Sequence, residues 1–139
     1  MSNIARLQSL TAKLETEPRS ATMPELPVLA YGYVRSNDRD TGYIKACAHL
    51  LEAWCTAAGW RLGVVFRDNG YDSISTARPG FAGFLDALRL PEAAFGLVID
   101  HSHLSDDEDV AKQLVAEVRR TSAVLRVVAD DLEDGKAAK

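Results

Sequence analysis

The sequence has 139 residues, of which 47% are hydrophobic and 26% are charged, and its net charge at pH 7 is −4. A chain of this length and composition is typical of one soluble globular domain, and it is too short for two. Acidic residues equal or outnumber basic ones in residues 1–27, 28–128 and 129–139 alike. This balance argues against the basic surface on which most nucleic-acid-binding domains depend.

Residues 3–15 form the first predicted helix. Its apolar side chains recur every three or four residues, at Ile4, Leu7, Leu10 and Leu14. Such a helix either packs on its own domain or docks onto a partner, and the sequence leaves both alternatives open. Prolines at positions 18, 24 and 27 prevent its continuation. Residues 1–27 are therefore assigned to an N-terminal amphipathic helix and linker.

From residue 28 onward, predicted strands alternate with predicted helices. The strands are residues 28–34, 62–66, 95–99 and 124–128, and the helices between them are residues 41–60, 79–90 and about 106–120. Strands joined by helices form a parallel sheet with right-handed crossovers. The sequence therefore predicts an α/β fold: a three-layer domain over residues 28–130, with a central, mainly parallel sheet of four to five strands. Residues 131–139 are assigned to a polar tail.

Cys47 and Cys55 lie on one predicted helix, and eight residues of helix separate them by about 12 Å. That distance is beyond the reach of a disulfide bond, so we interpret both as buried thiols in a reducing compartment. The chain has no apolar run of about 18 residues and no signal-peptide pattern at its N-terminus. We therefore expect a cytoplasmic protein with no membrane partner.

Polar side chains follow the predicted strands, at the edge of a parallel sheet where ligands usually bind. These residues are Arg35, Ser36, Asn37, Asp38, Asp68, Asp100, His101, Ser102, His103, Asp130 and Asp131, with Arg78 at the start of the second domain helix. Because the ends of parallel strands meet at one edge, we expect these side chains to lie close together.

Three kinds of ligand commonly bind at such an edge: nucleotides, metal ions and phosphate groups. No glycine-rich nucleotide motif is present, so we predict no cofactor. Asp100, His101 and His103 are weak candidates for a metal site, because His-x-His at a strand end is a known ligand arrangement. Arg35 and Arg78 are the candidates for binding phosphate. The alternative for either arginine is an internal salt bridge to Asp68.

Three segments resemble the catalytic domain of the resolvase/invertase family of serine recombinases. Residues 32–35 (Gly-Tyr-Val-Arg) resemble the family's opening strand, and residues 65–68 (Val-Phe-Arg-Asp) resemble its second strand, which ends in aspartate. Residues 77–81 (Ala-Arg-Pro-Gly-Phe) resemble its Arg-Pro-Gly helix start. The resemblance covers about residues 29–130. It implies the resolvase fold, and it implies DNA cleavage and strand exchange through a phosphoserine link.

The residues that would carry this chemistry differ from the family's pattern. The family's nucleophilic serine stands two residues after the arginine, where this chain has Asn37, and an amide cannot attack a phosphodiester. Ser36 is adjacent, but alternation along a strand is expected to turn it to the other side. Ser102 replaces the family's aspartate. His103 and Asp106 replace two arginines that would stabilise the pentacovalent phosphate.

The resemblance and these departures lead to three hypotheses about function. The first is a non-catalytic, resolvase-like module of DNA recombination that acts through a protein partner or self-association. Its vestigial site would consist of Arg35, Ser36, Asn37, Asp68 and Ser102, and the family residues that it keeps are Arg35, Asp68 and Arg78. The second is residual DNA binding or cleavage of the serine recombinase type, with Ser36 as nucleophile. The third is a metal-dependent enzyme. The chain ends before the long helix and the DNA-binding domain that follow in the family, so we expect any binding to DNA to be weak.

Overall fold

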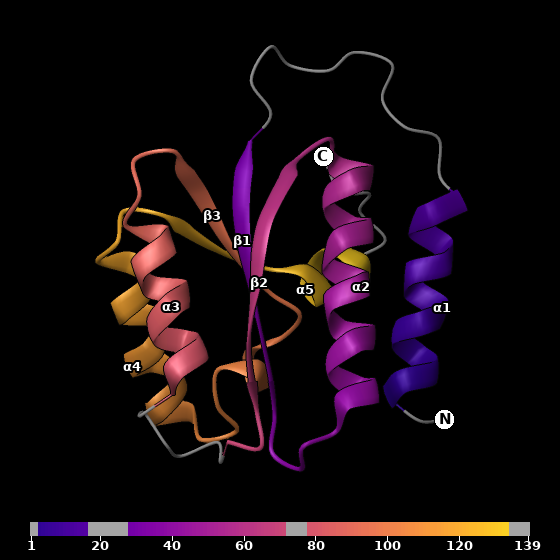
Figure 1. Cartoon of the computed structure of the whole chain (residues 1–139), viewed down its shortest axis with the longest axis horizontal. Coiled ribbons are helices and arrows are strands. Elements are labelled where there is room, and N and C mark those ends of the chain that lie inside the picture. Colours follow the sequence, from indigo (N-terminus) through magenta and orange to yellow (C-terminus); the bar gives the residue numbers. More distant parts are fainter. Residues whose placement is uncertain (1–2, 17–27, 72–77, 134–139) are drawn as a thin grey trace.

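The computed structural model describes residues 3–16, 28–71 and 78–133 (Figure 1). The predicted linker at 17–27 and the end of the predicted tail, 134–139, lie outside the described residues. In chain order the elements are α1 (Asn3–Thr16), β1 (Leu29–Ser36), α2 (Thr41–Ala58), β2 (Arg61–Asn69), α3 (Pro79–Leu88), β3 (Ala93–Val98), the 3₁₀ helix η1 (His101–His103), α4 (Glu108–Arg119), β4 (Val124–Val127) and α5 (Val128–Glu133).

The four described strands form one sheet in the order β2-β1-β3-β4, and every neighbouring pair is parallel. Helices α3 and α4 cover one face of this sheet, whereas α2 and α5 cover the other (Figure 1). The predicted three-layer α/β fold is thus confirmed. Helix α1 adds an outer layer, because it packs on the side of α2 that faces away from the sheet (Figure 1).

Each face of the sheet has its own apolar core. On the α2 face, Leu50, Leu51 and Trp54 are fully buried, and on the opposite face Phe84 and Leu114 are. The apolar side chains of α1 join the α2 core, with Leu7, Leu14, Ile4 and Leu10 packed there. The first alternative for this helix is therefore correct: it packs on its own domain, where Leu7 and Leu14 are buried.

Helix α2 has a clear signal at each end. The Asp40 side chain accepts a hydrogen bond from the backbone N–H of Tyr43, and Gly59 ends the helix with a φ of 75°. Cys47 and Cys55 are free and buried, and burial raises the pKa of each thiol to about 12, so both stay protonated. In the described part of the chain, no helix is long and apolar enough to cross a membrane.

Several element boundaries differ from the sequence prediction, and three of them lie near the ends of the strands. Strand β1 continues through Ser36 and β2 continues through Asn69, because Arg35 pairs with Asp68 and Ser36 with Asn69 in the ladder between them. Backbone pairing thus overrides the polar composition of these segments. Residues 128–133 form α5 where a strand end and a tail are predicted. The backbone N–H of Ala129 donates to the carbonyl of Ile99 at 2.8 Å, which ties this helix to the end of β3.

Candidate functional site

A polar cleft of about 230 Å³ lies at the carboxyl ends of β1 and β3. The residues that line it come from α1, the end of β1, the start of α2 and the segment after β3: Asn3, Arg35, Ser36, Asn37, Asp38, Asp40, Tyr43, Ser102 and Asp106. Of the predicted strand-end residues, five line this cleft: Arg35, Ser36, Asn37, Asp38 and Ser102. Asp68, Asp100, His101 and His103 do not line it, and Asp130 is an exposed residue of α5. Three carboxylates and one guanidinium line the cleft, so its charge is predominantly negative.

Arg35 is held by oxygen atoms of the protein itself. Its Nε donates to the carbonyl of His103 at 3.3 Å, and Nη2 donates to the carbonyl of Ser102 at 2.6 Å. Nη1 donates to the carbonyl of Tyr71 at 3.0 Å and also to Oδ1 of Asn37. Four of its five N–H groups are thus engaged. Only 5% of the residue is exposed, and burial, followed by the charge of Arg78, lowers its pKa.

These contacts correct one of the two interpretations of Arg35. The acceptors of its guanidinium are three backbone carbonyl oxygens and the amide oxygen of Asn37, not the carboxylate of Asp68. The salt-bridge alternative is therefore wrong for Arg35. Arg78 is 3% exposed and stands at the N-terminal boundary of α3, close enough for its charge to affect Arg35. The fold thus brings both cations to one end of the sheet, and their binding of phosphate stays a prediction.

Asn37 and Ser36 occupy different positions at this site. Asn37 is exposed, and its side-chain oxygen accepts from Arg35. Ser36 is buried, and its Oγ accepts from the backbone N–H groups of Asp38 at 3.3 Å and Asp40 at 3.4 Å. Both residues line the cleft, so alternation along the strand does not separate them as expected. The chain turns immediately after Ser36, and the serine hydroxyl shapes that turn.

His103 lies between β1 and α2, with 1% of the residue exposed. Its Nδ1 accepts the backbone N–H of Arg35 at 3.1 Å, which requires an unprotonated nitrogen. The proton of the neutral ring is therefore on Nε2, and this N–H donates to Oη of Tyr43 at 3.0 Å. Burial lowers the pKa of His103 to about 4, so the imidazole is neutral at physiological pH.

The proposed metal ligands are not brought together. His101 is exposed, whereas His103 points into the domain with both ring nitrogens hydrogen-bonded. The Asp100 carboxylate accepts from the backbone N–H of Ser102 at 2.9 Å and from the Ser102 hydroxyl. Among the described residues, no group of three histidine, cysteine or acidic side chains is arranged to hold a metal ion. The 3₁₀ turn separates residues that a strand would have placed on one side.

Asp68 organises the start of α3. Its carboxylate accepts from the backbone N–H of Gly80 at 2.7 Å, from that of Phe81 at 2.9 Å and from the hydroxyl of Tyr33 at 2.8 Å. Arg78, the boundary residue of α3, makes no capping bond with its side chain. A carboxylate from β2 therefore satisfies the first N–H groups of this helix. Burial and the charge of Asp68 raise the pKa of Tyr33.

The sequence did not single out Tyr33 and Tyr43 as site residues. Tyr33 lies two positions before Arg35 on β1, and its hydroxyl donates to Asp68. Tyr43 stacks on the His103 ring, and burial raises the pKa of its hydroxyl. A tyrosine in a buried strand needs a partner for its hydroxyl, which is the signal that could have identified Tyr33. Tyr43 stands three residues after the helix-capping Asp40, and its partner lies 60 positions away.

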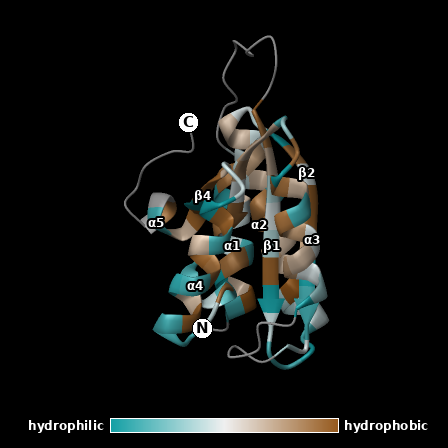
Figure 2. Ribbon diagram, turned by 90° about the vertical axis from the view of Figure 1, so that its left-hand side faces the viewer, coloured by the Kyte–Doolittle hydropathy of each residue, from teal (hydrophilic) through white to brown (hydrophobic). Residues whose placement is uncertain are grey.

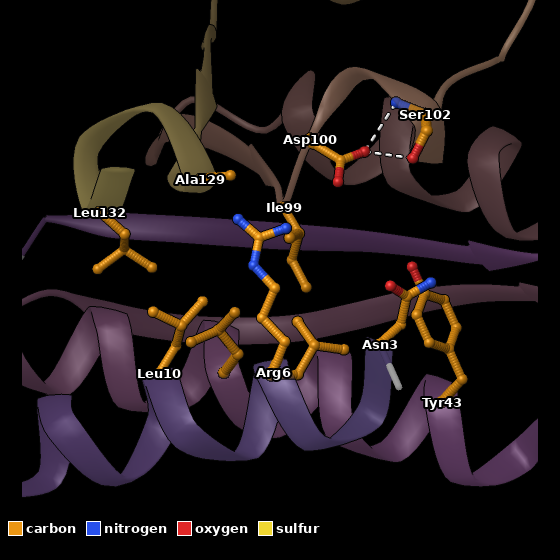
Figure 3. Close-up of a pocket in the computed structure, with 11 residues that line it drawn as sticks. Asn3, Arg6, Leu10, Tyr43, Ile99, Asp100, Ser102, Ala129 and Leu132 are labelled. Carbon is orange, nitrogen blue, oxygen red and sulfur yellow. Dashed lines mark hydrogen bonds between the residues drawn. The ribbon is translucent and has the colours of Figure 1, made fainter. Parts of the chain in front are cut away.

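A second cavity, of about 110 Å³, lies between α1, α5 and the end of β3 (Figure 3). Apolar side chains such as Leu10, Ile99 and Leu132 line it, and Arg6 reaches from α1 across it toward Ile99 (Figure 3). Tyr43 lines both this cavity and the polar cleft. The cavity is smaller than typical small-molecule sites, and we assign it to the packing of α1 on the domain.

One family model matches the sequence, and several solved structures share its fold. Residues 30–139 match the family model described as "Resolvase, N terminal domain". The structure is similar to the N-terminal catalytic domain of TP901-1 integrase, with a TM-score of 0.66, 17% identity, and coverage of 73% of this chain and 79% of that one. No curated protein matches the sequence closely enough to count as a relative.

Two further solved structures are similar. One is the C-terminal catalytic domain of ISC1926 TnpA, an IS607-like serine recombinase, with a TM-score of 0.65, 16% identity, and coverage of 77% of this chain and 75% of that one. The other is the first open reading frame of transposon ISC1904 from Sulfolobus solfataricus P2, with a TM-score of 0.56, 16% identity, and coverage of 71% and 66%. At these identities, the similarity shows a shared fold.

Proposed function

This chain belongs to the resolvase N-terminal domain family, and from that premise we propose that it is a non-catalytic member that acts through protein contacts in DNA recombination. The observation that carries this proposal is the pairing of Asn37 with Arg35. At the position where the family resemblance expects a nucleophilic hydroxyl, the chain has an amide whose oxygen accepts from the guanidinium.

The chemistry of strand exchange requires a group that attacks phosphorus and leaves again. A carboxamide is a very weak nucleophile, and Asn37 has no hydroxyl from which a phosphoserine-type link could form. Both N–H groups of Arg35 Nη1 and one of the two on Nη2 donate within the protein, so a phosphate clamped by both η nitrogens would have to displace the Tyr71 carbonyl or the Asn37 amide oxygen. Both the nucleophile and the electrostatic stabilisation of the transition state are therefore compromised.

The charges around the cleft support the same proposal. Asp38, Asp40 and Asp106 line it, and a phosphodiester that approached Arg35 would pass these carboxylates. Coulomb repulsion from exposed carboxylates weakens the binding of an anion, and it does so most at low salt. The free thiols Cys47 and Cys55 suit a reducing compartment, so we place this activity in the cytoplasm.

A second candidate function is DNA cleavage with Ser36 as nucleophile. The observation that favours it is that Ser36 lines the same cleft as Arg35. Against it, the Ser36 oxygen already accepts two backbone N–H bonds that hold the turn after β1. A serine in this position would have to release the turn before its hydroxyl could attack.

The test is to incubate the purified protein with supercoiled plasmid and to look for a covalent protein–DNA adduct after denaturation. We expect no adduct from the natural chain, and none from Asn37→Ser, because Arg35 would remain tied to the carbonyls of Tyr71, Ser102 and His103. An adduct formed by the natural chain and lost in Ser36→Ala would overturn the proposal in favour of the second candidate. A nuclease-treated pull-down in parallel would show whether bound proteins depend on DNA.

A further inference from the structure

Helix α1 covers the outer side of α2, and it precedes the part of the chain that the family model matches. That match begins at residue 30, whereas α1 ends at Thr16. In Figure 1, α1 lies beside α2 on the side that faces away from the sheet. The α1–α2 seam, the contact between these two helices, therefore joins the resolvase-like domain to an element outside it.

Each helix contributes to the seam a stripe of side chains with a seven-residue repeat. Hydrophobic and hydrophilic residues alternate along α1 (Figure 2), and its stripe consists of Ile4, Leu7, Thr11 and Leu14. The α2 stripe consists of Tyr43, Ala46, Leu50, Ala53 and Ala57. Except for Thr11, all of these side chains belong to the apolar core on this side of the sheet or pack against it. Alternating spacings of three and four residues are the pattern of two helices packed as a coiled coil.

Two contacts fix the relative direction of the helices. A Cβ atom at Gly42 would lie 3.6 Å from Cδ1 of Ile4, near the start of both helices. Further along both, the carboxylate of Glu15 lies 3.3 Å from Nε2 of His49. The two helices therefore run parallel. Glu15 and His49 stand at the e and g positions beside the stripes, where parallel coiled coils carry ion pairs between helices.

Thr11 is the polar residue of the α1 stripe, and only 2% of it is exposed. Its hydroxyl donates to the carbonyl of Leu7 at 2.8 Å, so this bond lies within α1. A polar residue at such a position fixes the register of two helices and lowers the stability of their contact. The ion pair between Glu15 and His49 is exposed and contributes little. The seam is therefore specific in register and modest in strength.

We propose that the α2 stripe binds an amphipathic helix of another protein and that α1 is its built-in competitor. The inference rests on the proposed function, because it names a surface and a class of partner for a module that acts through protein contacts. Helix α1 shows which ligand fits: a helix with apolar side chains at spacings of three and four residues. The alanines of the α2 stripe let the backbone of such a helix approach closely. Twelve residues of chain join Thr16 to Leu29, so a displaced α1 stays tethered and competes as an intramolecular ligand.

The position of Thr11 gives such a partner its advantage. A helix with valine, isoleucine or leucine there buries more apolar surface against α2 than α1 does. A second copy of the chain brings the same threonine and has no such advantage. The seam therefore favours a helix from a different protein over an exchanged α1.

Hydrogen exchange of the natural full-length chain tests whether α1 opens on its own. We expect the amides of α1 to exchange at least about tenfold faster than those of α2 near Leu50, because local opening requires less free energy than unfolding. Thr11→Val should slow the exchange of α1 about tenfold, because a methyl group replaces the hydroxyl in the seam. Thr16→Val is the matched control, because it makes the same replacement at an exposed position of α1 and should leave the exchange of the seam residues unchanged.

A labelled peptide of residues 3–16 tests whether the α2 stripe accepts a helix from outside. Leu14→Ser removes a buried apolar side chain from α1, so fluorescence anisotropy should show that this variant binds the peptide about tenfold more tightly than the natural chain does. Thr11→Val in the protein should weaken the binding, and Thr11→Val in the peptide should strengthen it. A control peptide that carries Leu7→Ser and Leu14→Ser should bind neither protein.

Three outcomes would overturn the inference. One is an α1 whose amides exchange as slowly as those of α2, and another is a peptide that binds the natural chain and Leu14→Ser equally or binds neither. The third, measured by sedimentation velocity, is a dimer of the natural chain that excess peptide dissociates, because the α2 stripe would then hold α1 of a second copy. Should Leu14→Ser fail to fold, hydrogen exchange of the natural chain and of Thr11→Val still decides.

None of these outcomes bears on the proposed absence of catalysis, which the covalent-adduct assay decides separately. An adduct-forming protein whose α1 yields to the peptide would overturn the proposed function and keep this surface.

Discussion

The backbone N–H of Arg35 donates a hydrogen bond to Nδ1 of His103, a residue 68 positions away in the sequence. This bond joins the end of β1 to η1, and it fixes the imidazole as the neutral tautomer with its proton on Nε2. The same two segments are joined by the bonds from the Arg35 guanidinium to the carbonyls of Ser102 and His103. A neutral histidine is therefore part of the frame that holds the arginine.

The first prediction concerns pH. The pKa of His103 is about 4 in the fold and about 6.5 in an unfolded chain. Between these values the unfolded state binds a proton at this residue and the native state does not. Stability should therefore fall as pH drops from about 6.5 to about 4, by up to about 3 kcal/mol from this residue. Urea midpoints measured across this range should fall less steeply for His103→Gln than for the natural chain.

His101→Gln is the control for that experiment, because His101 is exposed and belongs to the same turn. The carboxylates are the same in His103→Gln and in the natural chain, so their effect on stability cancels when the two proteins are compared. If His103→Gln and the natural chain lose stability in parallel between pH 6.5 and 4, the imidazole is not neutral in the fold.

The second prediction concerns Asp68, whose carboxylate accepts from the N–H groups of Gly80 and Phe81 and from the Tyr33 hydroxyl. Asp68→Asn keeps one oxygen but turns an NH₂ group toward a donor, and it removes a negative charge from the start of α3. We expect a loss of about 2–3 kcal/mol in the free energy of unfolding, measured by urea denaturation. The control is Asp86→Asn, which removes a carboxylate from an exposed ion pair with Arg89 and should change the free energy of unfolding by less than about 0.5 kcal/mol. An equal loss of stability in Asp68→Asn and Asp86→Asn would contradict the capping role of Asp68.

The alternation of strands and helices could be read from the sequence, and so could the meeting of Arg35, Asn37, Asp38 and Ser102 at one edge. Hydrophobic periodicity and the geometry of parallel sheets are enough for both. The partners of Arg35 could not be predicted, because they are mainly backbone carbonyls, and every residue carries one. The sequence shows which side chains are charged. It does not show which backbone carbonyl will lie within hydrogen-bond distance of Arg35, as that of Ser102 does at 2.6 Å from Nη2.

His101 and His103 illustrate a second limit. The pattern His-x-His places both rings on one side only if the segment is a strand, and here it is a 3₁₀ turn that buries one ring and exposes the other. The turn depends on Asp100, whose carboxylate accepts from the backbone N–H of Ser102. Local side-chain to backbone bonds of this kind compete with strand formation, and they are hard to weigh from sequence alone.

The third prediction concerns Gly80, where α3 approaches β2. A Cβ atom at this position would lie 2.5 Å from the carbonyl oxygen of Arg67 and 2.8 Å from the Asp68 carboxylate. Gly80→Ala should therefore push the helix away from its cap and cost about 1–3 kcal/mol. Gly42→Ala is the matched control in the first turn of α2, where the nearest atom is 3.5 Å away, and alanine there should be neutral or stabilising by up to about 1 kcal/mol. Thermal melting compares the two, and a Gly80→Ala variant as stable as Gly42→Ala would contradict this close approach.

The last prediction separates a structural arginine from a phosphate-binding one. Arg35→Lys keeps the positive charge but replaces a planar fork by a single ammonium group, which cannot reach the carbonyls of Tyr71, Ser102 and His103 together. Buried carbonyls then lose their donors, so we expect a loss of about 2–4 kcal/mol in urea denaturation. Arg61→Lys, at an exposed position on β2, should change stability by less than about 0.5 kcal/mol. If Arg35 mainly binds phosphate, Arg35→Lys should instead leave stability intact, and Arg35→Gln, which removes the charge, should weaken DNA binding at low salt. Filter binding at two salt concentrations distinguishes the cases, because the loss of a cation that contacts phosphate lowers the salt dependence of binding and a packing defect does not.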